Sequence, residues 1–279
     1  MGVQGVIRDL KLNTWGYWDP NSTSIATVLK DNGYHTALVG KWHLGLESPN
    51  LPNDRGFTYF KGFIGDMMDD YYHHRRHGHN FMRSNYAEID PVGHATDLFS
   101  QWAVDYISES KERDEPFFLY LAYNAPHSPI QPPDAWVEKV LRREPGITEK
   151  RAKLVALTEH MDYGIGQVIQ SLKDNGVYEN TLIIFTSDNG CSKAADIDGL
   201  AEQGHIVSAH LRGSKADLWD GGHRIPFIVR WPGQVAPGTE SDQLICLTDL
   251  FATLSEITGA ELPKTSAQDS VSFLPALSG

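Results

Sequence analysis

The chain has 279 residues, of which 41% are hydrophobic and 22% are charged, an ordinary balance for a globular protein with a sizeable core. Its formal net charge of -12 supplies no basic surface for a phosphate backbone, so nucleic acid is excluded as an expected partner. Its two cysteines, Cys191 and Cys246, are too few for a disulfide framework.

The first half of the chain contains a helix, a strand and a long segment with little pattern. Residues 23–32 predict a helix that stops at Gly33, and residues 34–39 predict an apolar strand. Residues 51–90 have little periodicity and many Gly, Asn, Asp and His residues, which predicts a long loop. Loops of this length inside a domain are usually functional or disordered, and the aromatic residues here favour order.

The rest of the chain alternates helices and strands. We expect an amphipathic helix over residues 96–111 and a second strand over 117–122. A proline-rich connection over 129–146 leads to a long helix near 148–175. The remaining predicted elements are strands at 181–186 and 225–230 and a helix at 249–258.

The strands are apolar on both faces, which is typical of the middle of a parallel sheet. Helices that alternate with such strands indicate an α/β fold in which helices cover a mostly parallel sheet on both sides. Ligands of these folds bind at the carboxyl ends of the strands. The residues that follow each strand are therefore the candidates for a site.

Gly-Lys-Trp-His follows the first predicted strand. In an extended segment, residues i and i+2 point to the same side, so Lys41 and His43 would face one point while Trp42 turns into the core. A cation and a titratable imidazole aimed at one place suit an anion with a leaving group.

Polar residues also follow the other strands: His127 after the second, Asp188 and Asn189 after the third, and Lys215 shortly before the fourth. A carboxylate beside an amide oxygen suits a hard cation such as Ca²⁺ or Mg²⁺. Each residue has a plainer interpretation. Asp-Asn-Gly is a common turn, a lone histidine is usually structural, and lysines are usually solvated.

Residues 73–79 contain four histidines and two arginines. Their spacing fits no zinc pattern, so we interpret the segment as a polar loop, on the substrate side of the site.

Four motifs resemble those of one family. GKWHLG, APHSP, LIIFTSDNG and GSKADLWDGGHRIP are similar, in order and spacing, to the type I sulfatases of the alkaline-phosphatase superfamily. The resemblance runs from about residue 2 to the end. It implies an alkaline-phosphatase-like sheet sandwiched by helices, with residues 1–279 forming a partial sulfatase catalytic domain.

The resemblance implies a role for each matched residue. Lys41 and Lys215 would bind the sulfate oxygens, and His43 would lie beside the nucleophile and assist its proton transfers. His127 would act as general acid toward the leaving-group oxygen.

The resemblance also implies cofactors. Asp188 and Asn189 would supply part of a Ca²⁺ site. The family's nucleophile is a formylglycine made from the first residue of a C/S-x-P-x-R box, but neither Cys191 nor Cys246 opens such a box, and no serine does.

Further parts of the family pattern are absent from this sequence. They are the first strand with its paired aspartates, which Asp69 and Asp70 cannot replace from within a loop, and the C-terminal antiparallel domain. We therefore expect the 279 residues to be a fragment of a sulfatase, truncated at both ends and inactive alone.

The expected substrate is a sulfated carbohydrate or an aryl sulfate. One alternative is a phosphomonoester or phosphonate hydrolase of the same superfamily, which would need two metal ions. Another is a non-catalytic protein that binds anions. The resemblance implies a periplasmic, lysosomal or secreted parent, although the first residues resemble no signal peptide and no apolar run is long enough to span a bilayer.

Overall fold

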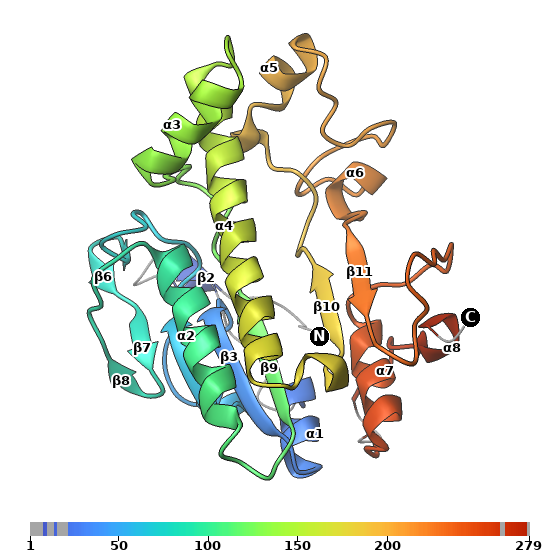
Figure 1. Ribbon diagram of the computed structural model, residues 1–279. Coiled ribbons are helices and arrows are strands. Elements are labelled where there is room, and N and C mark those ends of the chain that lie inside the picture. Colours follow the sequence, from blue (N-terminus) through green and yellow to red (C-terminus); the bar gives the residue numbers. More distant parts are fainter. Residues whose placement is uncertain (1–7, 10–13, 16–21, 263–265, 278–279) are drawn as a thin grey trace. The chain divides into compact units, whose positions relative to one another are not determined.

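The computed structural model describes residues 8–9, 14–15, 22–262 and 266–277 (Figure 1). The chain divides into two compact units. The first unit comprises residues 1–129, 161–176 and 240–279, and the second comprises 130–160 and 177–239. One helix, α4 (Glu149–Asp174), contributes residues to both units.

The first unit carries most of the strands and the helices that cover them. Its elements in chain order are β1 (Arg8–Asp9), β2 (Thr14–Trp15), α1 (Ile25–Asp31), β3 (His35–Lys41), the 3₁₀ helix η1 (Pro52–Arg55), β4 (Tyr59–Phe63), β5 (Arg75–Arg76), β6 (His79–Asn80), β7 (Met82–Ser84), β8 (Ala87–Glu88), α2 (Ala95–Ser110), β9 (Phe117–Ala122), α7 (Asp249–Thr258) and α8 (Leu274–Leu277).

The second unit is built mainly of helices and loops. Its elements are α3 (Asp134–Arg143), the 3₁₀ helices η2 (Tyr178–Asn180) and η3 (Lys193–Ala195), β10 (Ile183–Thr186), α5 (Ile197–Glu202), α6 (Asp220–His223) and β11 (Phe227–Arg230).

A mixed five-stranded sheet, in the order β8-β7-β4-β3-β9, forms the centre of the first unit. Its core is parallel, because β3 pairs in parallel with both β4 and β9, whereas β7 and β8 add antiparallel pairs at one edge. Ala37, Leu38 and Val39 of β3 are fully buried, as expected for a central parallel strand. The α/β class predicted from the sequence is confirmed.

Helices flank this sheet in the positions that the sequence predicts. The apolar stripe of α2 buries Phe99, Ala103 and Tyr106 completely, and α2 lies against the sheet in Figure 1. Ser24 caps the N-terminus of helix α1, and its Oγ accepts a hydrogen bond from the main-chain N–H of Thr27 at 2.8 Å. Such N-caps satisfy a donor that the helix itself leaves without a partner.

Two predicted loops are partly regular. Residues 51–90 contain β4, which is parallel to β3, and the short strands β5 to β8, so the prediction of one long loop is wrong. Strand β4 escapes a search for alternation because it is short and Phe60, Gly62 and Phe63 do not follow a two-residue period. The proline-rich stretch 129–146 likewise contains α3, which buries Val137 and Val140.

The last two predicted strands are antiparallel to each other. In the described structure β10 and β11 pair with each other, antiparallel, with Ile183 opposite Arg230 and Thr186 opposite Phe227. Their apolar sequences suggested burial on both faces, but Ile228 is 61% exposed and Phe185 39% exposed. The core of the second unit lies instead between α3 and the first half of α4, where Val137, Val140, Ala152 and Ala156 pack together.

Candidate active site

The carboxyl end of β3 presents Lys41. Two glycines allow this: a side chain on Gly40, whose φ is 113°, would overlap the carbonyl oxygen of Ala122, and one on Gly62 would overlap that of Gly40. Glycine therefore permits the backbones of β3, β4 and β9 to approach closely at this level. Lys41, the next residue, is half-buried at the end of three parallel strands.

Trp42 and His43 follow. Trp42 is 6% exposed and its Nε1–H donates to the carbonyl oxygen of Asn50 at 2.8 Å, so the prediction that it turns into the core is confirmed. His43 has a φ of 59°, in the left-handed region, while its main-chain N–H donates to Ile64 O at 3.3 Å. The backbone is therefore no longer extended at His43, and strand alternation does not determine where its side chain points.

His127 follows β9 in a tight turn. Its main-chain N–H donates to Asn124 O at 2.8 Å, and the hydroxyl of Tyr71 donates to its carbonyl oxygen at 2.9 Å. Its Nδ1 lies 2.8 Å from Ser128 O. Because a carbonyl only accepts, Nδ1 carries the proton, and Nε2 is the atom that gains and releases the second proton of an imidazolium.

One sheet edge collects the predicted residues of the first unit. Strands β3 and β9 are parallel, and Gly40 lies opposite Ala122 at their ends. The segments that carry Lys41 and His43 on one strand and His127 on the other therefore leave the sheet at the same edge. This is the edge at which parallel sheets bind ligands.

The second unit holds the other predicted residues. Asp188 is exposed and Asn189 half-buried, in the bend after β10. The Asn189 amide donates through Nδ2 to Gly190 O at 3.0 Å. In the described parts of the chain no hydrogen-bond or ion-pair donor contacts the carboxylate of Asp188. Two oxygens of the type that hard cations prefer thus stand side by side in the sequence, on one exposed bend.

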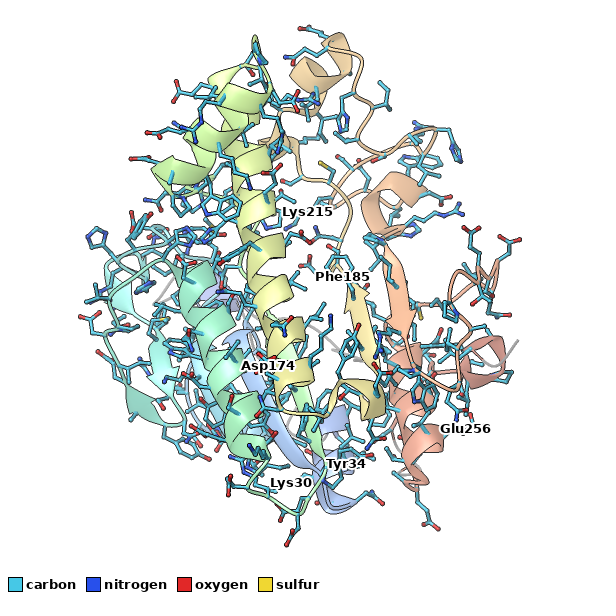
Figure 2. All side chains as sticks on the ribbon, viewed as in Figure 1. Lys30, Tyr34, Asp174, Phe185, Lys215 and Glu256 are labelled. Atoms are coloured by element: carbon cyan, nitrogen blue, oxygen red, sulfur yellow. The ribbon has the colours of Figure 1, made fainter. Side chains whose placement is uncertain are left out.

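Lys215 lies in the loop that precedes α6 (Figure 2). Its main-chain N–H donates to Cys191 O at 2.8 Å, and it is half-buried. Within the described ranges no carboxylate lies within ion-pair distance of its ammonium group. The preceding Ser214 is 6% exposed and donates through its main-chain N–H to Asp217 Oδ2 at 2.8 Å, which holds this turn in place.

The Asp188–Asn189 bend and the α6 segment are joined by main-chain contacts. Gly190 N–H donates to Gly222 O at 2.9 Å, and a side chain on Gly190 would overlap the carbonyl oxygen of Gly221. The glycines of the DNG and GGH motifs therefore permit a close approach of two backbones. Asp188, Asn189 and Lys215 are brought into one region of the second unit by this approach.

Cys191 lies beside these residues, but its environment does not activate a thiolate. Burial raises the pKa of the thiol above its ordinary value. Reactive cysteines have a lowered pKa, so the structure gives no sign of a cysteine nucleophile at this position.

The histidine-rich segment is a small hairpin tied down by its arginines. Arg76 donates to Asp66 at 2.9 Å and to Asp69 at 2.8 Å, and Arg75 pairs with both carboxylate oxygens of Asp90. Burial by itself raises the pKa of Asp69, but the hydrogen bonds from Arg76 and from the main chain of His77 lower it overall. These arginines are structural partners of carboxylates within the hairpin.

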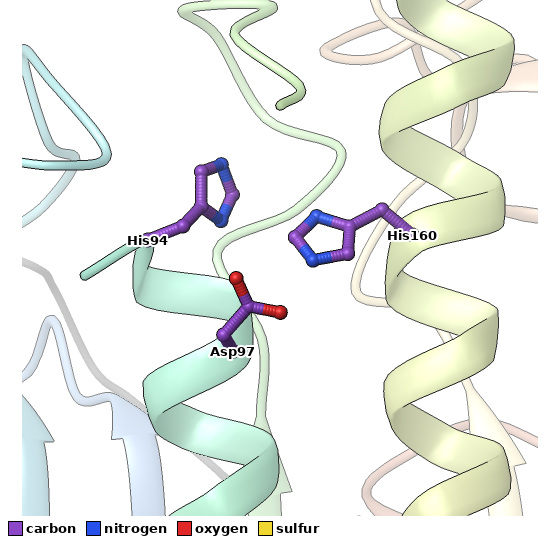
Figure 3. Close-up of side chains that lie close together, drawn as sticks. All are labelled: His94, Asp97 and His160. Carbon is purple, nitrogen blue, oxygen red and sulfur yellow. The ribbon is translucent and has the colours of Figure 1, made fainter. Parts of the chain in front are cut away.

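Sequence reasoning missed several polar residues of the first turn of α2 and its neighbourhood. Figure 3 shows His94 at the N-cap of α2, Asp97 in its first turn, and His160 on α4. All three are residue types that ligate metals. His160 belongs to the second unit, so no metal site is assigned to them. Tyr71 was also missed, because nothing in a single sequence marks a buried tyrosine as a partner of a distant main-chain carbonyl.

Comparison with known proteins identifies the family. A family model described as Sulfatase matches residues 11–260. The chain belongs to the sulfatase family. The resemblance seen in its motifs is thereby confirmed, and members of this family generally bind a metal ion.

Named relatives agree. The chain is 30% identical over 278 residues to the uncharacterized sulfatase YdeN of Escherichia coli, covering 91% of this chain and 47% of that protein. It is 31% identical over 261 residues to human N-acetylgalactosamine-6-sulfatase, covering 90% and 47%. It is 30% identical over 274 residues to an arylsulfatase of Hemicentrotus pulcherrimus, covering 91% of this chain and 46% of that protein. The chain thus spans about half the length of these relatives.

Solved structures give the same answer. The crystal structure of Ps i-CgsB has a TM-score of 0.82 and 29% identity, covering 94% of this chain and 59% of that one. The same protein in complex with k-i-k-neocarrahexaose has a TM-score of 0.79 and 27% identity, covering 98% and 59%. Among the helices that the structure describes, none combines the length and apolarity needed to cross a membrane.

Proposed function

We propose that the protein containing this chain is a sulfuric ester hydrolase, which uses water to convert a sulfate ester into an alcohol and inorganic sulfate. The observation that carries the proposal is the shared sheet edge. In a chain whose residues 11–260 match the sulfatase model, Lys41 ends β3, His43 follows it and His127 follows the parallel strand β9, at one edge of the sheet.

Lys41 and Lys215 are proposed to bind the sulfate oxygens. Negative charge on these oxygens is stabilised best by cations already in place, at little cost in reorganisation during the reaction. Lys215 supports this role because it is half-buried and no described carboxylate neutralises it. Its ammonium group can therefore donate charge-assisted hydrogen bonds to an anionic ligand.

His127 is proposed as the general acid for the leaving group. Its Nδ1 is engaged by Ser128 O, so the imidazolium would deliver the proton that it carries on Nε2. An imidazole is suited to this transfer near neutral pH. His43, which enters the same edge after Lys41, is proposed to assist the proton transfers of the nucleophile.

Asp188 and Asn189 are proposed to hold part of a Ca²⁺ site. The exposed carboxylate of Asp188 and the amide oxygen of Asn189 are ligands of the right chemistry, but Ca²⁺ takes six to eight oxygens. A bound Ca²⁺ would polarise the sulfate group. We propose that the remaining ligands and the formylglycine nucleophile belong to segments of the parent protein outside these 279 residues, which form part of its catalytic domain.

The proposed substrate is a sulfated carbohydrate or an aryl sulfate. A structure of Ps i-CgsB contains k-i-k-neocarrahexaose, and another relative is named an arylsulfatase. The residues just before the β5–β6 hairpin expose rings that suit a sugar face, including Tyr72, which is 41% exposed, and His73. A periplasmic, lysosomal or secreted location is proposed on the same family grounds.

The proposal is tested by sulfate release. The complete protein that contains this chain is incubated with 4-nitrophenyl sulfate and with a panel of sulfated mono- and disaccharides. Free sulfate is then measured by ion chromatography. We expect stoichiometric release of sulfate and alcohol from at least one of them. A folded, metal-loaded protein that releases sulfate from none of them refutes the proposal.

A further inference from the structure

We propose that Tyr71 is a positioning residue that holds His127 in the orientation needed to protonate the leaving group. The inference rests on the proposed function and adds a residue to it. Tyr71 connects the segment that precedes the β5–β6 hairpin to the turn after β9.

A partly buried hydrogen bond connects the two segments. The Tyr71 hydroxyl donates to the main-chain carbonyl of His127 at 2.9 Å, and Tyr71 is 1% exposed. Burial raises the pKa of Tyr71, so its hydroxyl remains protonated and can donate. Loss of the hydroxyl would leave the carbonyl of His127 without this donor.

Tyr71 is itself fixed at two further points. Its carbonyl oxygen accepts from the main-chain N–H of Ala95, the first residue of α2, at 2.8 Å. Its ring stacks on His94 with a centroid distance of 5.0 Å and an interplanar angle of 23°. The nearby His74 is fully buried, and its Nε2 lies 2.9 Å from Gly93 O. These contacts hold the main chain and the ring of Tyr71 in place, and with them its hydroxyl.

The position of the His127 ring depends on its main chain. The imidazole bonds to the neighbouring Ser128 O, so the ring and the peptide around it turn together. The hydrogen bond from Tyr71 to the carbonyl of His127 fixes the orientation of that peptide, and Tyr71 lies outside the turn. Small displacements of a catalytic group are costly, up to about a hundredfold in rate for 1 Å.

The test uses a substitution that removes only the hydroxyl group of the tyrosine. In the complete protein, Tyr71→Phe is compared with Tyr106→Phe, a matched control in α2. Tyr106 is also fully buried, and its hydroxyl lies 3.1 Å from the carbonyl of His35, at the opposite end of β3 from Lys41. Each variant is assayed with a sugar sulfate, whose leaving group needs a proton, and with 4-nitrophenyl sulfate, whose leaving group does not.

We expect Tyr71→Phe to lower kcat for the sugar sulfate by about tenfold, with kcat for the aryl sulfate within about twofold of wild type. Tyr106→Phe should change neither. In a His127→Ala background, Tyr71→Phe should cause no further loss, because the residue that it positions is gone.

Equal losses on both substrates, or a loss that persists in the His127→Ala background, would show that Tyr71 serves the fold alone and would overturn the inference. An unchanged rate on the sugar sulfate would overturn it too. These results are separate from a failure of the proposed function, which would appear as no sulfate release by the wild-type protein.

Discussion

The main-chain N–H of Lys215 donates to the carbonyl oxygen of Cys191 at 2.8 Å. This bond joins the segment that follows β10 to the turn that precedes α6, two stretches separated by a helix and a long loop. The bond places Lys215 close to the Asp188–Asn189 bend. A cation and two potential calcium ligands thus share one region of the second unit.

Lys215→Ala in the complete protein should lower kcat/KM by about a hundred- to a thousandfold, as expected for loss of one group that stabilises developing negative charge. The loss should be similar for aryl and sugar sulfates, because the sulfate oxygens are common to both. The control is Lys193→Ala, which removes an exposed lysine from the same loop region. A loss confined to one substrate class would mean that Lys215 contacts the alcohol part of the ester.

His127→Ala should distinguish substrates by their leaving groups. A sugar alkoxide needs a proton to depart, whereas 4-nitrophenolate departs readily as an anion. General-acid help contributes about a hundred- to ten-thousandfold where it is needed. The sugar sulfate should therefore lose at least a hundredfold in kcat while the aryl sulfate loses far less. Equal losses on both would remove the acid role and leave His127 as a structural or sulfate-binding residue.

Much of the first unit could be predicted because its elements are strongly patterned. The apolar stripe of α2 and the apolar run of β9 are both visible in the sequence. The structure has these elements at Ala95–Ser110 and Phe117–Ala122. Strand β4 could not be found in this way. It is short, and its place beside β3 depends on Gly62 meeting Gly40, a contact between residues far apart in the chain.

The expectation that ligands bind at the carboxyl ends of parallel strands identified candidate residues, but it did not predict their geometry. Alternation correctly placed Trp42 in the core, yet it failed at His43, where a left-handed backbone ends the strand. The prediction also treated β10 and β11 as parallel strands, whereas they pair antiparallel with each other. Apolar composition alone does not choose a strand's partner, because pairing depends on distant segments.

The 279-residue chain should bind Ca²⁺ weakly, with a Kd above about 10⁻⁴ M, because two protein ligands leave most of the coordination shell to water. Asp188→Asn should weaken the binding further, whereas Asp198→Asn, an exposed acid in α5, should not. Isothermal titration calorimetry measures this. Tight stoichiometric binding by the wild-type chain would mean that other carboxylates of these 279 residues complete the site.

Acid should destabilise the protein through His74. Burial, opposed in part by the hydrogen bond to Gly93, lowers the pKa of His74 below 6.5, so the unfolded state binds the proton more readily than the folded state. The stability that this group contributes is therefore present above about pH 6.5 and lost as the pH falls, by at most about 1.4 kcal/mol per pH unit for one proton.

The measurement is the free energy of unfolding in urea at pH 5, 6 and 7. His74→Asn should flatten this pH dependence, since asparagine tolerates the left-handed φ of 55° without titrating. His77→Asn is the matched control, because His77 has a similar φ of 50° but is exposed. An equal pH dependence in wild type and His74→Asn would rule out this contribution.

The proposed preference of the site for sulfate esters is tested most directly by comparing the turnover of two esters of one alcohol. The complete protein is given 4-nitrophenyl sulfate and 4-nitrophenyl phosphate under the same conditions, and its metal content is measured in parallel. We expect faster turnover of the sulfate, abolished by Lys215→Ala, with one metal ion per chain. Faster turnover of the phosphate, with two metal ions per chain, would contradict it.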